Sequence, residues 1–141
     1  MSNGRPEIVI FEVEDDRYGI PVDRVVEVNR ELVITNIPGA GQAVRGASNL
    51  RGQIVTVVDI RNILGFPEHP EDLIPTVLIA YSRNELVGIL VDSIVDVLQY
   101  DRHDIEPPPD NLPTEKAECL TGVIKDTEGL ISLIDLDIAL D

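Results

Sequence analysis

Residues 44–64, VRGASNLRGQIVTVVDIRNIL, place a glycine-flanked loop that carries an arginine directly before the most apolar strand of the chain. A related arrangement returns near the C-terminus, in residues 120–122, LTG, and residues 129–140, GLISLIDLDIAL. The second copy has no arginine at the position of Arg51. We therefore expect the shared residues to specify the fold, and Arg51 to be a candidate for function.

The repeat extends through the whole chain. Residues 8–28 match residues 77–97 in residue type without a gap, 69 positions apart, so that Gly19 meets Gly88. Further on the offset becomes 76, and Gly46 meets Gly122. We predict one domain over residues 1–141, built from a first barrel repeat at 7–66 and a second at 76–141. The sequence leaves open whether strands are exchanged between the two barrels.

Each half is predicted to begin with a β-hairpin, because apolar residues alternate along residues 9–13 and a turn signal follows at Asp15 and Asp16. The spacing of Val22, Val25 and Val26 then indicates a short helical turn, and residues 91–95 repeat it. Residues 54–60 are apolar on both faces apart from Thr56, which predicts a buried strand. Residues 60–64 and 136–140 indicate one helical turn each.

Many short strands separated by Gly and Pro favour small barrels over an alternating βαβ sheet. The predicted fold class is mostly β, with two small five-stranded β-barrels related by the internal repeat, packed around an apolar interface, and a few short helical turns. Gly19, Gly52, Gly88 and Gly122 are predicted to be structural glycines.

The composition excludes several classes of partner. The chain has 26 acidic and 11 basic residues and a net charge of −15, which disfavours nucleic acids and anionic membranes because both bind mainly through Lys and Arg. Only two of the basic residues are lysines. A halophilic source is one hypothesis and an ordinary acidic surface the other. Equal melting temperatures in dilute buffer and in molar salt would contradict the first.

The chain is expected to be a cytoplasmic protein without direct membrane insertion. Its single cysteine, Cys119, cannot form an intramolecular disulfide, and we expect it to be a small buried hydrophobe. No apolar run approaches the roughly 18 residues of a membrane-spanning helix, and the first residues lack the apolar core of a signal peptide.

No catalytic or cofactor-binding constellation emerges. Residues 39–44, GAGQAV, approach the dinucleotide fingerprint but end in valine and lack a strand–helix context. His69 and His103 stand in no zinc spacing and are expected to lie in exposed loops. The carboxylate pairs Glu12/Glu14 and Asp135/Asp137 could bind a hard cation, but so acidic a chain contains such pairs by chance. We predict no enzyme activity, no cofactor and no metal.

The asymmetry of the repeat remains. Residues 49–52, NLRG, face residues 125–128, KDTE, in the second half. Arg51 has two interpretations: an intramolecular salt bridge, which an acidic chain supplies easily, or a contact residue at an interface, where an arginine beside Leu50 and two glycines could be a hot spot.

At these residues the sequence resembles the CheW-like family of chemotaxis coupling proteins. The resemblance rests on an ordered set of segments over residues 8–140, among them residues 18–20, YGI, residues 46–61, GASNLRGQIVTVVDIR, and residues 87–92, VGILVD. It implies two five-stranded barrels, no catalytic activity, and a scaffold role that links chemoreceptor tips to the histidine kinase CheA. The chain departs from the family's usual pattern at Thr56, where a proline is expected.

The resemblance also implies a receptor-binding site. By position it assigns receptor coupling to Arg51 and a receptor-facing groove to a further set of residues: Val25, Glu27, Val28, Gly46, Asn49 and Leu50. The implied partners are methyl-accepting chemoreceptors and the regulatory domain of CheA, in arrays at the inner face of the membrane. The alternatives are an adaptor of a non-flagellar chemosensory system, the regulatory end of the kinase itself, or a carboxylate-based metal enzyme.

Overall fold

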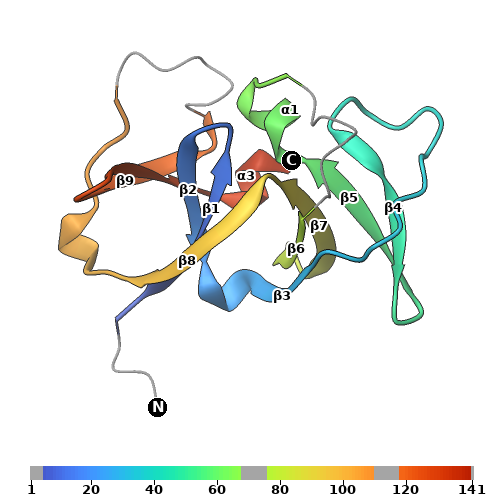
Figure 1. The fold of residues 1–141 in the computed structure, drawn as a ribbon, viewed down its shortest axis with the longest axis horizontal. Coiled ribbons are helices and arrows are strands. Elements are labelled where there is room, and N and C mark those ends of the chain that lie inside the picture. Colours follow the sequence, from blue (N-terminus) through green and yellow to red (C-terminus); the bar gives the residue numbers. More distant parts are fainter. Residues whose placement is uncertain (1–4, 68–75, 110–117, 141) are drawn as a thin grey trace.

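The structure, a computed structural model, describes residues 5–67, 76–109 and 118–140. Its strands form two five-stranded sheets, which we call sheet A and sheet B, and short helical segments connect them (Figure 1). Sheet A has the order β8 (Ser93–Gln99), β1 (Glu7–Val13), β2 (Asp16–Pro21), β10 (Gly129–Ile134), β9 (Leu120–Asp126). Sheet B has the order β3 (Val25–Asn29), β6 (Thr76–Ser82), β7 (Glu85–Val91), β5 (Gln53–Asp59), β4 (Val44–Leu50).

Each sheet takes strands from both halves of the sequence. Sheet A joins the first hairpin, β1 and β2, to β8, β9 and β10, while sheet B joins the second hairpin, β6 and β7, to β3, β4 and β5. Two parallel strand pairs, β2 with β10 and β5 with β7, join strands from the two halves of the sequence. Neither half of the sequence therefore contains a complete sheet, and the two halves depend on each other for their hydrogen bonds.

The predicted fold class is confirmed, but the sheets do not close into barrels. Within the described residues, β8 and β9 are the two edges of sheet A, and β3 and β4 are those of sheet B. The loop segments pair with the outer strands through single β-bridges, Thr35 to Ala47 and Glu106 to Val123. Closure would require a continuous ladder between the edge strands, and these irregular segments lie where it would form.

The predicted helical turns before β3 and β8 are largely wrong. Only Val22–Arg24 forms a 3₁₀ helix, η1, while Val25 already belongs to β3. In the second half β7 ends at Val91 and β8 begins at Ser93, without a helix. The reason is a β-bulge at Val26, repeated at Val95 in β8. One extra residue shifts the alternation of the strand and gives its apolar residues a spacing that resembles a helix.

The predicted helical turns after β5 and β10 are confirmed, as α1 (Ile60–Leu64) and α3 (Leu136–Ala139). Asp59 Oδ1 accepts the Arg61 N–H at 3.0 Å, and Asp135 Oδ1 accepts the Ile138 N–H at 3.2 Å. Gly65 ends α1 with a φ of 84°. None of the helices within the described ranges has the length and apolarity needed to cross a membrane.

The core lies between the two sheets. Its largest cluster combines Phe11 and Tyr18 of sheet A with Leu78 and Ile89 of sheet B, and α1 and α3 add apolar residues to it. A second cluster of buried side chains comes from the strands of sheet B, and a third comes from the strands of sheet A. Cys119 is buried in the first cluster, as predicted. The prediction of a fully buried strand is wrong at Ile54, which is 69% exposed. The start of β5 lies near the tip of a hairpin, where one face of the strand is in solvent.

The structural glycines lie where strands approach one another closely. A Cβ atom at Gly122 would stand 2.5 Å from Ile105 Cγ2, and one at Gly19 would stand 2.7 Å from Ile8 Cδ1. At Gly88 the nearest atom, Val77 Cγ1, would be 2.9 Å away. Gly52 has open space around it, and its φ of 88° gives the reason for glycine there.

Candidate partner-binding site

The β4–β5 hairpin turns through Arg51 and Gly52, because Leu50 pairs with Gln53. Both turn residues have positive φ, 50° and 88°, which is the pattern of a type I′ turn. Asn49 Oδ1 accepts the Gly52 N–H at 2.8 Å and supports the turn. Asn or Gly normally occupies the first turn position, so an arginine there carries backbone strain. Such strain is found most often at functional sites.

The Arg51 side chain forms an ion pair with Glu27 of β3, in which Nη2 donates to Glu27 Oε2. Because β3 and β4 are opposite edges of sheet B, the contact means that the sheet curls until its edges approach each other. The Arg51 guanidinium lowers the pKa of Glu27, and Asn29 Nδ2, which donates to Glu27 Oε1 at 3.3 Å, lowers it further.

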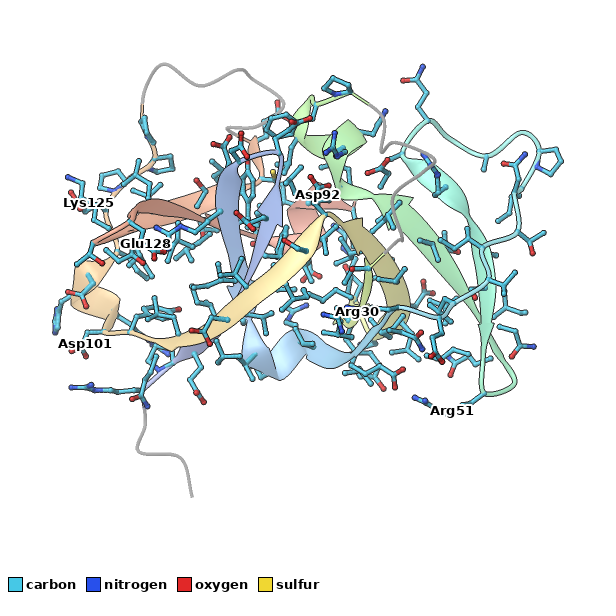
Figure 2. The ribbon with its side chains drawn as sticks, in the orientation of Figure 1. Arg30, Arg51, Asp92, Asp101, Lys125 and Glu128 are labelled. Atoms are coloured by element: carbon cyan, nitrogen blue, oxygen red, sulfur yellow. The ribbon has the colours of Figure 1, made fainter. Side chains whose placement is uncertain are left out.

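The salt bridge does not bury Arg51. Its side chain remains 69% exposed, whereas that of Glu27 is 25% exposed. Figure 2 shows Arg51 at the tip of the hairpin, at one end of the molecule. Both interpretations of Arg51 are thus compatible with the geometry: Glu27 holds the guanidinium in place, and its outer side faces solvent.

Two residues of the predicted groove lie inside the protein instead. Leu50 is 6% exposed and packs with Val55 and Val57 in the core of sheet B. Gly46 is buried, and a Cβ there would stand 2.2 Å from the Thr35 carbonyl oxygen. We therefore correct both to scaffold residues. Leu50 points inward because it belongs to the same alternation as the core residues of β4.

The β3 edge supplies the remaining predicted residues and one that the sequence did not single out. Val25 is half-buried against the core between the sheets, and Val28 is 36% exposed. Val26, the bulged residue, is 44% exposed. The equivalent residues of β8, Val95 and Val97, are also exposed. A bulge pattern recognised in the sequence could have identified Val26.

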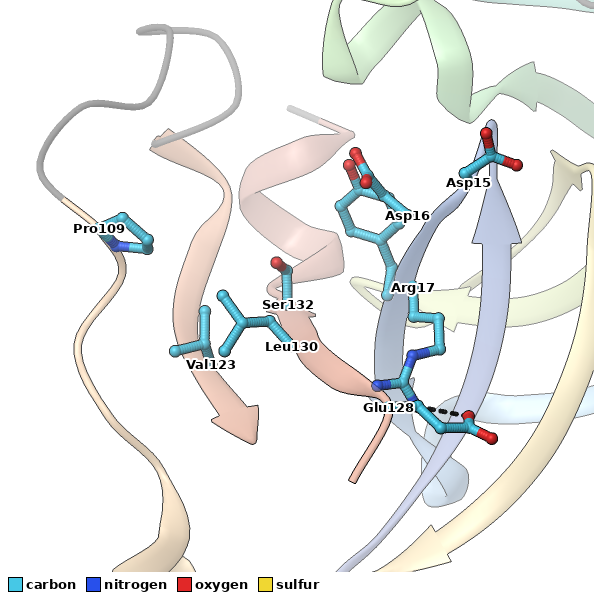
Figure 3. A pocket seen from close by; sticks show the side chains of 9 residues that line it. Asp15, Asp16, Arg17, Pro109, Val123, Glu128, Leu130 and Ser132 are labelled. Atoms are coloured by element: carbon cyan, nitrogen blue, oxygen red, sulfur yellow. Dashed lines mark ion pairs between the residues drawn. The ribbon is translucent and has the colours of Figure 1, made fainter. Parts of the chain in front are cut away.

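The β9–β10 hairpin, at the matching position of the second half, carries a different ion pair, in which the hairpin supplies the acid. Asp126 accepts two hydrogen bonds from Arg17 of β2, at 2.7 and 2.6 Å, and Glu128 lies 3.5 Å from the same guanidinium. The Arg17 guanidinium lowers the pKa of Asp126 to about 2. Arg17 and Glu128 also line a hollow of about 380 Å³, together with Asp15, Asp16 and Leu130 (Figure 3).

The two short helices carry opposite charges at a matching position. Arg61 of α1 is nearly buried and donates to Asp92 at 2.9 and 2.6 Å and to Glu14 at 2.7 Å. The matching residue of α3 is Asp137, which accepts from Arg24 at 3.1 and 3.3 Å and from Ser82 at 2.9 Å. The sequence analysis missed both clamps, although the repeat aligns Arg61 with Asp137 and could have indicated them.

The carboxylates considered for metal binding all have protein partners. Glu14 and Asp137 hold arginines, Asp135 caps α3, and Glu12 accepts a hydrogen bond from Ser93 at 3.1 Å. In the described part of the chain, no three His, Cys, Asp or Glu side chains gather in a way that could hold a metal ion. His103 is exposed in η2 (Arg102–Asp104), and His69 lies outside the described residues. Residues 39–43 form a loop with turns before β4, which begins at Val44.

Comparison with known proteins places this architecture among scaffolding proteins of chemotaxis. A solved structure of the scaffolding protein TtCheW from Thermoanaerobacter tengcongensis superposes with a TM-score of 0.87, at 28% identity, over 97% of this chain and 93% of that one. A chemotaxis protein CheW from Klebsiella aerogenes is 30% identical over 131 residues, covering 93% of this chain and 79% of the relative.

Further relatives agree. The chemotaxis protein CheW of Rhizobium meliloti is 29% identical, over 97% of this chain and 88% of its own length. Protein FrzA of Myxococcus xanthus is 27% identical over 88% of this chain and 78% of its own length. The model of the CheW-like domain matches residues 7–141, which include every strand and both helices described above. The chain therefore belongs to the CheW-like domain family.

Proposed function

We propose that the protein is a non-catalytic adaptor of a chemosensory array, which couples the cytoplasmic tips of chemoreceptors to the histidine kinase CheA. The observation that carries the proposal is the match of the CheW-like domain to residues 7–141, nearly the whole chain. The likeness to a scaffolding protein over 97% of the chain supports it. The protein would then act in the cytoplasm, at receptor arrays on the inner face of the membrane.

Receptors are proposed to bind at the tip of sheet B. Arg51 is exposed there, Glu27 fixes its direction, and the exposed Asn49, Val26 and Val28 lie on the same hairpin or on the facing strand. An exposed arginine next to apolar side chains is the usual composition of an interface hot spot. A receptor helix could lay an apolar stripe against the β3 valines and a carboxylate against Arg51.

The kinase is proposed to bind elsewhere on the two sheets, through its regulatory domain. Two separate contacts on one rigid body would let a change in the receptor alter the geometry of the kinase without any chemistry in the adaptor. Weak individual contacts suffice, because an array repeats them many times. Of the carboxylates considered for metal binding, Glu14 and Asp137 are in ion pairs within the fold.

An adaptor of a non-flagellar chemosensory system is the second candidate. The match to FrzA over 126 residues shows that the comparison does not single out one kind of relative. The two candidates predict the same fold and the same contact chemistry. They differ in which receptors the protein sediments with, and a panel of receptor tips from both kinds of system distinguishes them.

The direct test is co-sedimentation with a receptor cytoplasmic tip and with the kinase, separately and together. High salt screens the repulsion between acidic proteins and should be used throughout. We expect Arg51→Ala to weaken receptor-tip binding by about 5- to 150-fold, the range of interface anchors, while the protein stays folded. Arg102→Ala removes one exposed arginine from η2 and is the matched control. Wild-type affinity in folded Arg51→Ala would refute the assignment of Arg51.

A further inference from the structure

A second arginine has the same unusual backbone as Arg51. The β6–β7 hairpin turns through Arg83 and Asn84, because Ser82 pairs with Glu85, and the two φ angles are 51° and 66°. Arg83 thus occupies the first position of a type I′-like turn, where a residue without a long side chain is normal. The strain is tolerated although nothing in the hairpin requires an arginine.

The two strained arginines lie at the same end of sheet B. Strands β5 and β7 are parallel neighbours, with Thr56 beside Val87, and each begins directly after one of the two turns. Arg24 lies between the two turns. Its side chain donates to the Tyr81 carbonyl near the β6–β7 turn, and its backbone immediately precedes β3, the strand that carries Glu27. From Arg24 to Glu27 is three residues, or about 10 Å of extended chain.

The β6–β7 turn borders a hollow of about 520 Å³ with the composition of a recognition site. It is lined by Arg24, Tyr81, Arg83, Asn84 and Asp137. The Tyr81 side chain is 47% exposed, in a chain with only three tyrosines and no tryptophan. Tyrosine and arginine are the residues most enriched at binding hot spots. An exposed tyrosine beside two arginines therefore indicates a protein-binding surface.

The hydrogen bonds of Arg24 in the hollow are longer than those that the nearly buried Arg61 donates to carboxylates. Arg24 donates to the two Asp137 carboxylate oxygens at 3.1 and 3.3 Å and to the Tyr81 carbonyl at 3.3 Å, and Arg83 Nη2 donates to the Asp137 carbonyl at 3.2 Å. Arg61, by contrast, holds Asp92 at 2.6 and 2.9 Å and is only 7% exposed. The Arg24 side chain is 40% exposed. An incoming carboxylate could therefore share Arg24 with Asp137.

The repeat indicates that this chemistry is not needed for the fold. The matching positions of the first half, 69 residues earlier, hold Glu12, Glu14 and Asp15 in place of Tyr81, Arg83 and Asn84. Glu14 even has the same backbone conformation as Arg83, with a φ of 58°. One scaffold thus accepts an acidic turn and a basic turn. Arg83 also meets Asp137 where Glu14 meets Arg61, so the reversed partner explains the charge at this turn, while the scaffold leaves that charge exposed beside the hollow.

We infer that the hollow binds a carboxylate side chain of the receptor tip, as a second contact beside the one at Arg51. The inference rests on the proposed function. Arg24 and Arg83 would receive the carboxylate, and the Tyr81 ring would pack against its neighbouring apolar residues. A separation of about 10 Å along β3 equals the rise of about seven helical residues, so the two acidic groups would lie two turns apart on one receptor helix.

A single carboxylate fits the hollow better than a polyanion. Asp23 and Asp135 act on Arg24 in addition to Asp137, so three carboxylates face two arginines and leave no excess positive charge for a polyanion. The net charge of −15 repels nucleic acids and anionic lipid surfaces. One carboxylate delivered on a neutral or apolar surface avoids most of that repulsion.

The test compares turn variants in receptor-tip and kinase binding. Arg83→Gly removes the guanidinium while relieving the positive φ, and it is the variant expected to leave the fold unchanged. Arg83→Glu reverses the charge at a turn whose backbone accepts Glu14 in the first half, but it places the new carboxylate near Asp137, so its folding is checked by urea denaturation. We expect receptor-tip affinity to fall about 5-fold in Arg83→Gly and at least tenfold in Arg83→Glu. Tyr81→Ala should also weaken it, and kinase affinity should not change. Arg102→Ala is the charge control.

The possible outcomes separate this inference from the proposed function. If Arg51→Ala weakens tip binding but the Arg83 variants bind like wild type, the second contact is wrong and the adaptor role stands. If the Arg83 variants lose kinase affinity instead, the receptor is the wrong occupant. If the wild-type chain binds no receptor tip, the proposed function fails and the second contact with it. A loss confined to the tip, absent in Arg102→Ala, supports the inference.

Discussion

The β4–β5 and β9–β10 hairpins occupy matching positions in the two halves, yet they make their ion pairs with opposite charges. At the first, the turn supplies the cation, Arg51, and β3, the opposite edge of sheet B, supplies Glu27. At the second, the hairpin supplies the anion, Asp126, and a neighbouring strand supplies Arg17. Figure 2 shows the two hairpins at opposite ends of the molecule, marked by Arg51 and by Lys125 and Glu128.

The difference teaches that the repeat did not preserve the ion pairs of its hairpins. Arg51 and Glu27 align with Thr127 and Asp96, whereas Asp126 and Arg17 align with Leu50 and Leu86. At α1 and α3 the aligned residues themselves differ in charge, with Arg61 in one and Asp137 in the other. The exposed charge of each hairpin is then available for recognition. A partner that binds Arg51 would find no matching arginine on the β9–β10 hairpin.

The largest effect should come from breaking the α1 clamp. Arg61→Leu removes a nearly buried guanidinium and leaves Asp92, whose side chain is 16% exposed, without it. We expect the free energy of unfolding to fall by about 3 kcal/mol, because the Asp92 carboxylate stays in a mostly buried position without its guanidinium partner. Urea denaturation measures the loss. Asp137→Leu, at the matching position of α3, should cost less because that pair is more exposed. Equal losses would contradict the difference in burial.

The paired glycines should give the next largest effect. Gly46→Ala places a Cβ against the Thr35 backbone at a φ of 156°, whereas Gly122→Ala meets the Ile105 side chain first. We expect a loss of about 2–4 kcal/mol for Gly46→Ala and a smaller one for Gly122→Ala, because the nearest backbone oxygen would be 2.2 Å from the new Cβ at Gly46 and 2.9 Å at Gly122. Gly52→Ala, with open space around it, isolates the cost of a positive φ. A larger loss for Gly122→Ala would contradict this order.

The dependence of the free energy of unfolding on pH, on the acid side, should report the ion pair of the β9–β10 hairpin. Arg17 lowers the pKa of folded Asp126 from 3.8 to about 2, so the pair stabilises the fold above pH 4 and the contribution disappears as the pH falls toward 2. Asp126 is 31% exposed, which limits the gain to about 1 kcal/mol. Asp126→Asn should make the free energy of unfolding depend less on pH between pH 4 and pH 2. An unchanged slope would show that the pair adds nothing to stability.

The smallest effect on stability should come from the first hairpin. Arg51→Gly removes an exposed ion pair but also removes the strain of an arginine at a φ of 50°, so the two changes oppose each other. We expect a melting temperature within about 2 °C of wild type. Arg17→Ala is the matched removal at the second hairpin and should lower it further. A clear loss in Arg51→Gly would make Arg51 a structural residue.

Local patterns predicted much of the fold. The two hairpins, β1–β2 and β6–β7, the two helical turns and the burial of Cys119 follow from spacing and residue type within short windows. Residues 44–50, interpreted from the sequence as a loop, form strand β4 instead. The errors at residues 25–26 and 91–95 arise from β-bulges, whose extra residue depends on the pairing partner and leaves only an ambiguous spacing in the sequence. Leu50 was misjudged because the sequence showed that it neighbours Arg51 but not which face it takes.

The sequence by itself determined that two copies of one plan exist, and that Arg51 stands in only one of them. Only the tertiary structure decided that the copies exchange strands, that Glu27 reaches Arg51 across the curled sheet, and that Arg61 and Asp137 form clamps of opposite charge. The physical reason is range. Periodicity reports how a residue faces its own neighbours, whereas an ion pair depends on which distant strand the backbone hydrogen bonds bring beside it.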